Sequence, residues 1–112
     1  MAAKKNPLNL NPLQLKTLTL FQALATLPDH TRAGPEPGTV VVGNLPHPHG
    51  DHFHLGDAAV AARDATGLGN QAVWVALERK GLIRSGYPYE ALLTADGLAY
   101  ETGLHILHRA EH

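Results

Sequence analysis

The sequence predicts a small α+β domain in which a capped helix is followed at once by a β-hairpin. The main evidence is the stretch from Asn70 to Thr94, NQAVWVALERKGLIRSGYPYEALLT. It holds a favourable N-cap, a ten-residue run without a helix breaker, and two short apolar runs around a turn-rich tip. A second observation is the β-branched run Thr39–Val42, the strongest strand-forming segment of the chain.

The central helix is predicted from Gln71 to Lys80. The side-chain oxygen of Asn70 can accept from the free backbone N–H groups of the first turn. Arg79 and Lys80 lie in the last turn, where cations suit the helix dipole, and Gly81 follows at the position that favours a left-handed backbone. Three apolar residues share the face that we expect to be buried: Val73, Trp74 and Leu77.

The hairpin after this helix is predicted from two apolar runs, Leu82–Ile83 and Ala91–Leu93. Between them, residues 85–89 (SGYPY) supply the turn. Thr94 is then the expected N-cap of a last helix, which the pattern extends from Ala95 to about Arg109.

The chain before the central helix is predicted to begin with a flexible arm over residues 1–10. Asn11 caps a first helix with Pro12 at its first position, and the helix runs to about Leu27. Its leucines cover more than half of the circumference, so two packing partners are expected. One is the domain core, and the other is a second copy of the chain. The sequence thus favours a homodimer through the first and last helices.

The middle of the chain combines loops, two strands and a helix. Residues 29–38 have the composition of a loop, and the strand Thr39–Val42 is expected to turn through residues 43–51 into a returning strand, His52–Leu55. Asp57 is then the expected cap of a second helix, Ala58–Thr66, separated from the central helix by the tight turn 67–69.

The string ALERKGLI, a polar turn and LLTADG resembles the recognition helix and wing of winged helix-turn-helix proteins, including the MarR-type and ArsR-type regulators. The resemblance implies a winged-helix domain over residues 11–112, with additional N- and C-terminal helices and a small β-hairpin. It also implies a DNA-binding transcription regulator that places the Asn70 helix in the major groove of double-stranded DNA. A winged-helix module for metal binding or protein interaction, without DNA binding, is the alternative.

The DNA contacts that follow from this arrangement come from the central helix and the hairpin. Gln71 and Arg79 are the base readers on the exposed helix face, while Glu78 would repel phosphate. The remaining contacts are assigned to phosphate anchors and to the wing: Lys80, Arg84, Tyr87 and Tyr89, with Arg63, Lys4, Lys5 and Lys16 nearby.

Composition limits the function classes. The chain has 112 residues, a formal net charge of -1 and no cysteine, which excludes disulfides, thiolate zinc sites and a cysteine nucleophile. DNA-binding domains usually carry a basic surplus, which this chain lacks. Neither a signal peptide nor a membrane-spanning stretch is apparent, so a cytoplasmic protein without membrane contact is expected.

Histidine is the unusual component, with eight residues in all. The segment HPHGDHFH holds four histidines and a carboxylate, and these are the candidate metal ligands: His47, His49, Asp51, His52 and His54. In an extended chain, alternate residues share a face, so either His47 with His49 or His52 with His54 could present two imidazoles to one ion. Imidazoles with a carboxylate suit a divalent transition metal such as zinc or nickel.

The same segment is similar to the H-x-H-x-D-H signature of metallo-β-lactamase-fold hydrolases. That similarity covers about six residues, and the further ligands of the hydrolase fold have no counterpart in the chain. Without a phosphate-binding loop or a serine nucleophile elbow, the sequence predicts a protein that is not an enzyme.

A second histidine group lies near the C-terminus. On a continuous helix, His105, His108 and His112 would form one stripe with Glu101. Such a stripe could be a metal edge or a pH-sensitive dimer seam. The alternative is a frayed helix end with histidines near the negative end of the dipole.

Overall fold

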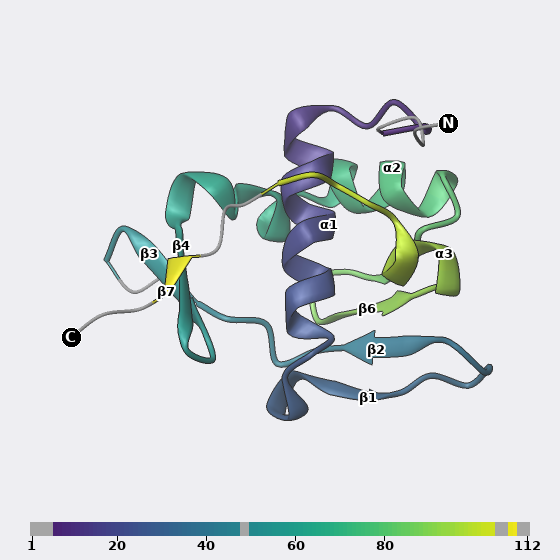
Figure 1. The fold of residues 1–112 in the computed structure, drawn as a ribbon, viewed down its shortest axis with the longest axis horizontal. Helices are drawn as coiled ribbons and strands as arrows, with labels where there is room; N and C mark the ends of the chain where they lie inside the picture. The colour runs from purple at the N-terminus through teal and green to yellow at the C-terminus, as the bar shows by residue number, and fades with distance from the viewer. Residues whose placement is uncertain (1–5, 48–49, 105–107, 110–112) are drawn as a thin grey trace.

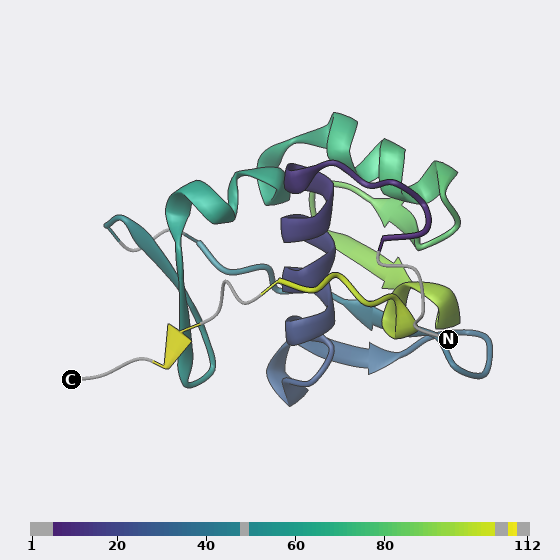
Figure 2. The ribbon, with the colours of Figure 1, turned by 45° about the horizontal axis from the view of Figure 1, so that its top comes forward.

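The computed structural model describes residues 6–47, 50–104 and 108–109 (Figures 1 and 2). They form a mixed helix and strand fold with two antiparallel sheets. The helices are α1 (Pro12–Leu24), α2 (Gln71–Arg79) and α3 (Ala95–Ala99), with 3₁₀ turns η1 (Pro28–His30), η2 (Ala62–Asp64) and η3 (Thr66–Gly69). The strands are β1 (Thr31–Ala33), β2 (Val40–Val42), β3 (His52–Leu55), β4 (Ala58–Ala61), β5 (Ile83–Gly86), β6 (Glu90–Leu93) and β7 (His108–Arg109).

The two sheets lie on different sides of α1 (Figure 1). The larger sheet has the strand order β1-β2-β6-β5 and the smaller one β3-β4-β7. In the larger sheet Val41 stands opposite Leu92, and Ile83 stands opposite Leu93. The smaller sheet projects from the body of the molecule in both views (Figures 1 and 2).

Helix α1 starts as its sequence predicts and ends three residues early. The Asn11 side chain accepts from the backbone N–H of Gln14, and the Gln14 side chain accepts from the backbone N–H of Asn11, which completes a capping box. The helix ends at Leu24 rather than Leu27. Leu27 is extended (φ -108°, ψ 117°), as expected for a residue that precedes proline.

The core is built on α1, whose second half is buried almost completely. The Phe21 and Trp74 rings meet edge to face with their centroids 5.0 Å apart, and this contact joins α1 to α2. Trp74 also donates its indole N–H to the Gly67 carbonyl at 3.0 Å, so its polar atom is satisfied inside the core.

The other side of α1 is covered by the same chain. Thr19 donates its hydroxyl to Thr102 at 2.7 Å, and the Gln22 amide donates to the carbonyl oxygens of Gly97 (2.9 Å) and Tyr100 (2.7 Å). The apolar breadth from which the sequence predicts a homodimer is therefore used within one chain. The homodimer remains a prediction, but the apolar surface of α1 no longer supports it.

The residues just before α1 are also packed. Leu10 is buried, and its backbone N–H donates to the Asn6 side chain at 2.8 Å. The Tyr100 hydroxyl donates to Asn6 and accepts from the backbone N–H of Leu8. The segment 6–10 is thus tied to the chain near residue 100, while residues 1–5 of the predicted arm lie outside the described part.

The second predicted helix, Ala58–Thr66, is wrong. Residues 58–61 form β4, which pairs with β3 through the two-residue turn Gly56-Asp57, and 3₁₀ turns follow. Gly56 has φ +59°, a conformation that suits a two-residue hairpin. The turn chemistry and the pairing override the helix propensity of the alanines in this segment.

Two further expectations are corrected. The strand β3 does not return along β2, and the predicted loop 29–38 contains β1, which pairs with β2 in its place. The last helix does begin at the Thr94 cap, which accepts from Gly97 N–H at 3.0 Å, but it ends at Ala99. Tyr100 is extended and Gly103 has φ +71°, so the chain runs along α1 instead.

None of the helices in the described part of the chain has the length and hydrophobicity needed to span a bilayer.

The close approach of η3 to α1 gives a stability prediction. A Cβ atom at Gly67 would lie 1.8 Å from the hydroxyl oxygen of buried Thr17, whereas one at Gly69 would meet nothing within 4 Å. Gly67→Ala should therefore lower the free energy of unfolding by about 1–3 kcal/mol, the usual effect of overpacking. Gly69→Ala is the matched control. Equal urea midpoints for the two variants would contradict the packing described here.

Candidate metal centre

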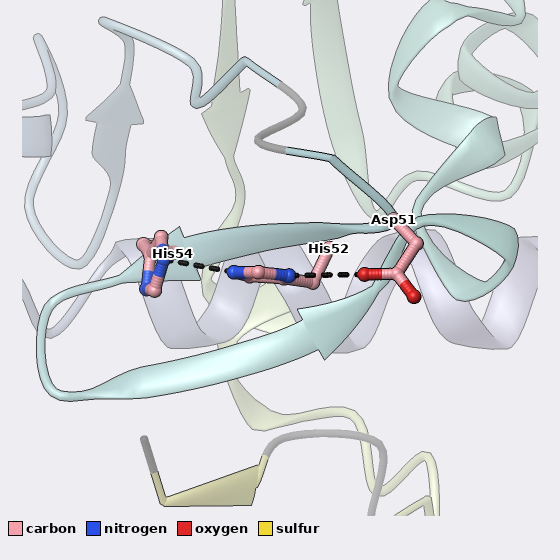
Figure 3. Close-up of polar contacts among 3 residues, drawn as sticks. All are labelled: Asp51, His52 and His54. Atoms are coloured by element: carbon pink, nitrogen blue, oxygen red, sulfur yellow. Dashed lines mark hydrogen bonds and ion pairs between the residues drawn. The ribbon is translucent and has the colours of Figure 1, made fainter. Parts of the chain in front are cut away.

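The alternation of β3 determines which of its side chains face outward. Leu55 is buried and Phe53 packs against the core, so His52 and His54 lie together on the other face of the strand. The two-residue turn and the pairing of His52 with Ala61 hold this register. The sequence leaves two possible histidine pairs open, and the structure brings together His52 and His54 (Figure 3).

The two imidazoles meet through their Nε2 atoms. His52 Nε2 lies 3.0 Å from His54 Nε2, and the rings are nearly perpendicular, at 84°. On the other side of its ring, His52 Nδ1 lies 3.2 Å from a carboxylate oxygen of Asp51 (Figure 3). The Asp51 carbonyl accepts from the backbone N–H of Ala62 at 2.7 Å, which fixes this residue at the base of the hairpin.

These contacts are compatible with an arrangement of protons in which His52 donates its Nδ1–H to Asp51 and His54 donates its Nε2–H to the Nε2 lone pair of His52. A metal ion that replaced the shared proton would be bound by both Nε2 atoms.

The geometry needs little change to hold an ion. Two metal–nitrogen bonds of about 2.0–2.1 Å at a tetrahedral angle place the nitrogens about 3.3 Å apart. The observed separation is 3.0 Å. A carboxylate on the distal nitrogen is the usual outer partner of a metal-bound histidine, where it fixes the ring and makes it a better donor. The donors therefore fit a divalent transition metal such as zinc or nickel.

The carboxylate in this arrangement is fully exposed, and its acidity reflects the contact. The hydrogen bond from His52 lowers the pKa of Asp51 below its usual value of 3.8. The backbone N–H of Asp51 and the charge of His52 lower it further. Because the folded-state pKa is depressed, the contact stabilises the fold above the usual carboxyl pKa, and this stabilisation disappears as pH falls through the lowered one.

The other predicted ligands are placed differently. His47 is exposed and lines a groove of about 430 Å³ together with Phe53, on the side of β3 opposite to the histidine pair. His49 lies outside the described residues. Within the described ranges, no group of three or more histidine, aspartate or glutamate side chains is arranged so that all of them could hold one metal ion.

The C-terminal histidine stripe is wrong as a helical feature, because α3 ends at Ala99. His108 instead stands in β7, paired with Ala59 of β4. His105 and His112 are outside the described part of the chain.

Part of the positive charge near the residues predicted to contact DNA is balanced by carboxylates. Gln71, Arg79 and Lys80 are exposed on α2 and at its end. In the adjoining hairpin, Arg84 pairs with Glu36 at 3.1 Å, and Arg32 of β1 pairs similarly with Glu90. Two cations of the larger sheet are thus balanced by carboxylates.

The two predicted wing tyrosines have different roles. Tyr87 packs edge to face on Trp74, with ring centroids 5.1 Å apart, and donates its hydroxyl to the Gly69 carbonyl at 2.9 Å. It joins the hairpin to the start of α2. Tyr89 is 78% exposed. Glu78 accepts from the backbone N–H of Ser85 at 3.0 Å, a contact that the sequence pattern does not anticipate.

Comparison with protein-family models, with curated proteins and with solved structures gave no significant match. The chemistry of the described side chains is therefore the basis for the function proposed below.

The His52–Asp51 contact predicts a measurable pKa difference. In His52→Ala the pKa of Asp51 should rise toward 3.8, because the largest cause of its depression is removed. His54→Ala, which leaves the Asp51 contact in place, is the matched control. The carboxyl ¹³C resonance of Asp51, followed during acid titration, measures the shift. An unchanged pKa in His52→Ala would rule out the hydrogen bond.

Proposed function

We propose that this protein binds a divalent transition metal, zinc or nickel in class, through His52 and His54 on the β3–β4 hairpin. The observation that carries the proposal is the 3.0 Å approach of the two Nε2 atoms, with Asp51 on the distal nitrogen of His52. Remaining coordination positions are available to water or to further ligands, because both side chains reach solvent: His54 is exposed and the His52 side chain is 36% exposed.

Two features favour this role over an accidental contact. The apolar face of β3, with Phe53 and Leu55, anchors the strand to the core, so both rings start from a fixed backbone. The outer carboxylate restricts the rotation of His52, which lowers the entropic cost of binding an ion. The role is one of binding and not of catalysis.

We also propose that the larger body is a winged-helix domain that carries the metal hairpin as an insertion. The strand order β2-β6-β5 beside α1 and α2 supports this, with β5 and β6 as the wing. Two departures accompany it: β1 is an added edge strand, and the 3₁₀ turns of residues 62–69 stand where the resembled proteins have a second helix.

The metal proposal predicts selective weakening of metal binding. His52→Ala and His54→Ala should each lower zinc affinity by at least about tenfold, and Asp51→Ala by about tenfold, the lower end of the effect for an outer partner of a metal-bound histidine. His47→Ala, an exposed histidine on the other side of the strand, is the control. Isothermal titration with zinc and nickel at pH 7.5 measures the affinities. Failure of the parent chain to bind either metal stoichiometrically would refute the proposal.

Double-stranded DNA is a second candidate ligand, favoured by the exposed Gln71, Arg79 and Lys80 next to the β5–β6 hairpin. We propose a weak contact only, since Arg84 and Arg32 are already paired with carboxylates. A metal-responsive transcription regulator would combine both activities.

The DNA contact has its own test. The double variant Arg79→Ala/Lys80→Ala should weaken binding to a mixed-sequence duplex and reduce the slope of log K against log salt by about 0.9 for each phosphate that the variant no longer neutralises. Arg32→Ala, whose charge is already paired, is the control. Fluorescence anisotropy at low and moderate salt reports both effects. Absence of salt-dependent association at micromolar protein would eliminate this candidate.

A further inference from the structure

The histidine pair lies where another molecule can reach it. The smaller sheet projects from the body of the protein in both views (Figures 1 and 2). His54 is exposed, and the His52 side chain is 36% exposed. Across the strand pair, Ala59 stands opposite His54 and Ala61 opposite His52, so the cross-strand neighbours on this face have short side chains. Ligands from a second molecule can therefore approach the two Nε2 atoms without displacing the core.

One such pair supplies half of the donors of a closed metal site. His52 and His54 offer two Nε2 atoms to one ion. A structural zinc site has four protein donors at the corners of a tetrahedron. A second copy of the pair brings the other two, and a twofold axis through the ion makes the two copies equivalent. Both halves of the site are then encoded by the same residues.

We propose that zinc takes its remaining two ligands from the His52–His54 pair of a second copy, so that one ion joins two chains. This inference rests on the proposed metal binding and adds the partner to it. The homodimer expected for this protein then forms through the β3–β4 hairpin and not through α1.

Charge favours two copies over one. The Asp51 carboxylate lies 3.2 Å from the distal nitrogen of His52, and four imidazoles bring no charge of their own when they are neutral. A zinc ion with one such carboxylate nearby keeps one positive charge unbalanced, whereas the carboxylates of two copies balance both charges. The whole chain has a formal net charge of -1, so the repulsion between two copies is small.

The direction of the pair determines how the two hairpins meet. The contact between His52 and His54 runs along β3 (Figure 3). Opposite edges of a tetrahedron are perpendicular, so the β3 strands of the two copies cross at nearly a right angle. Crossed strands meet over a small area, whereas a stable protein interface buries about 1,200–2,000 Å². The ion is therefore the main link, and the chains separate when it is removed.

The first experiment follows the mass of the full-length chain by sedimentation velocity at pH 7.5. Zinc should convert monomer to dimer, with isothermal titration giving one ion for two chains, and EDTA should restore the monomer. His52→Ala, His54→Ala and His54→Gln should each lose the zinc-dependent dimer. His47→Ala, which removes an exposed histidine on the other side of β3, should dimerise as the parent chain does.

The second experiment tests whether both copies must carry the pair. The double variant His52→Ala/His54→Ala, labelled at its N-terminal amine, is mixed with unlabelled parent chain and zinc. It should stay monomeric because it brings no imidazole to the ion, whereas labelled His47→Ala should enter dimers. Entry of the double variant into zinc-dependent dimers would overturn the inference.

The stoichiometry separates this inference from the function on which it rests. A monomer that binds one zinc ion per chain, with His52→Ala and His54→Ala defective, would overturn the dimer and leave the metal site standing. A dimer that persists in EDTA and in both histidine variants would also overturn it. Failure of the parent chain to bind zinc would instead remove the proposed function, and this inference with it.

Discussion

Burial of the second half of α1 is the constraint on which the rest of the structure depends. A helix with so wide an apolar surface must be covered completely, and a chain of 112 residues has limited material with which to cover it. The large sheet and α2 cover part of the helix, with the Phe21–Trp74 contact at their junction. The segment after α3 covers another part, through Thr102 and the Tyr100 carbonyl.

The way in which the C-terminal segment covers α1 explains where the histidines lie. Because the C-terminal segment leaves α3 at Ala99 and crosses α1, it reaches the small sheet and adds β7 to β4 (Figure 2). Phe53 and Leu55 anchor the hairpin to the body, which turns His52 and His54 outward. The candidate metal centre therefore lies on a short strand at the periphery of the core.

Electrostatics separates the two candidate ligands. A nucleic acid requires cations that are free to meet phosphate, whereas Arg84 and Arg32 face Glu36 and Glu90. A transition metal requires neutral nitrogen donors that converge, and the Nε2 atoms of His52 and His54 do so. For this reason we propose metal before DNA as the ligand, although the helix and hairpin that resemble a recognition helix and wing are present as elements.

Local sequence determined the helix starts and the main hairpin. The caps at Asn11, Asn70 and Thr94 are confirmed, and so are the strands on either side of the 87–89 turn. Each of these features depends on contacts within a few residues, between a side chain and the nearby backbone or across a tight turn. The same period-2 pattern put His52 and His54 on one face.

Tertiary structure alone decided the remaining arrangement. Residues 58–61, which are mostly alanine, form a strand because pairing with β3 outweighed their helix propensity. The last helix ends early, and the chain that follows packs on α1, where the Tyr100 carbonyl accepts from Gln22. That residue 108 aligns with residue 54 across Ala59 depends on a strand pairing between distant segments. Such pairings cannot be predicted from a local sequence pattern, because their free energy comes from surfaces that come into contact only when the chain folds.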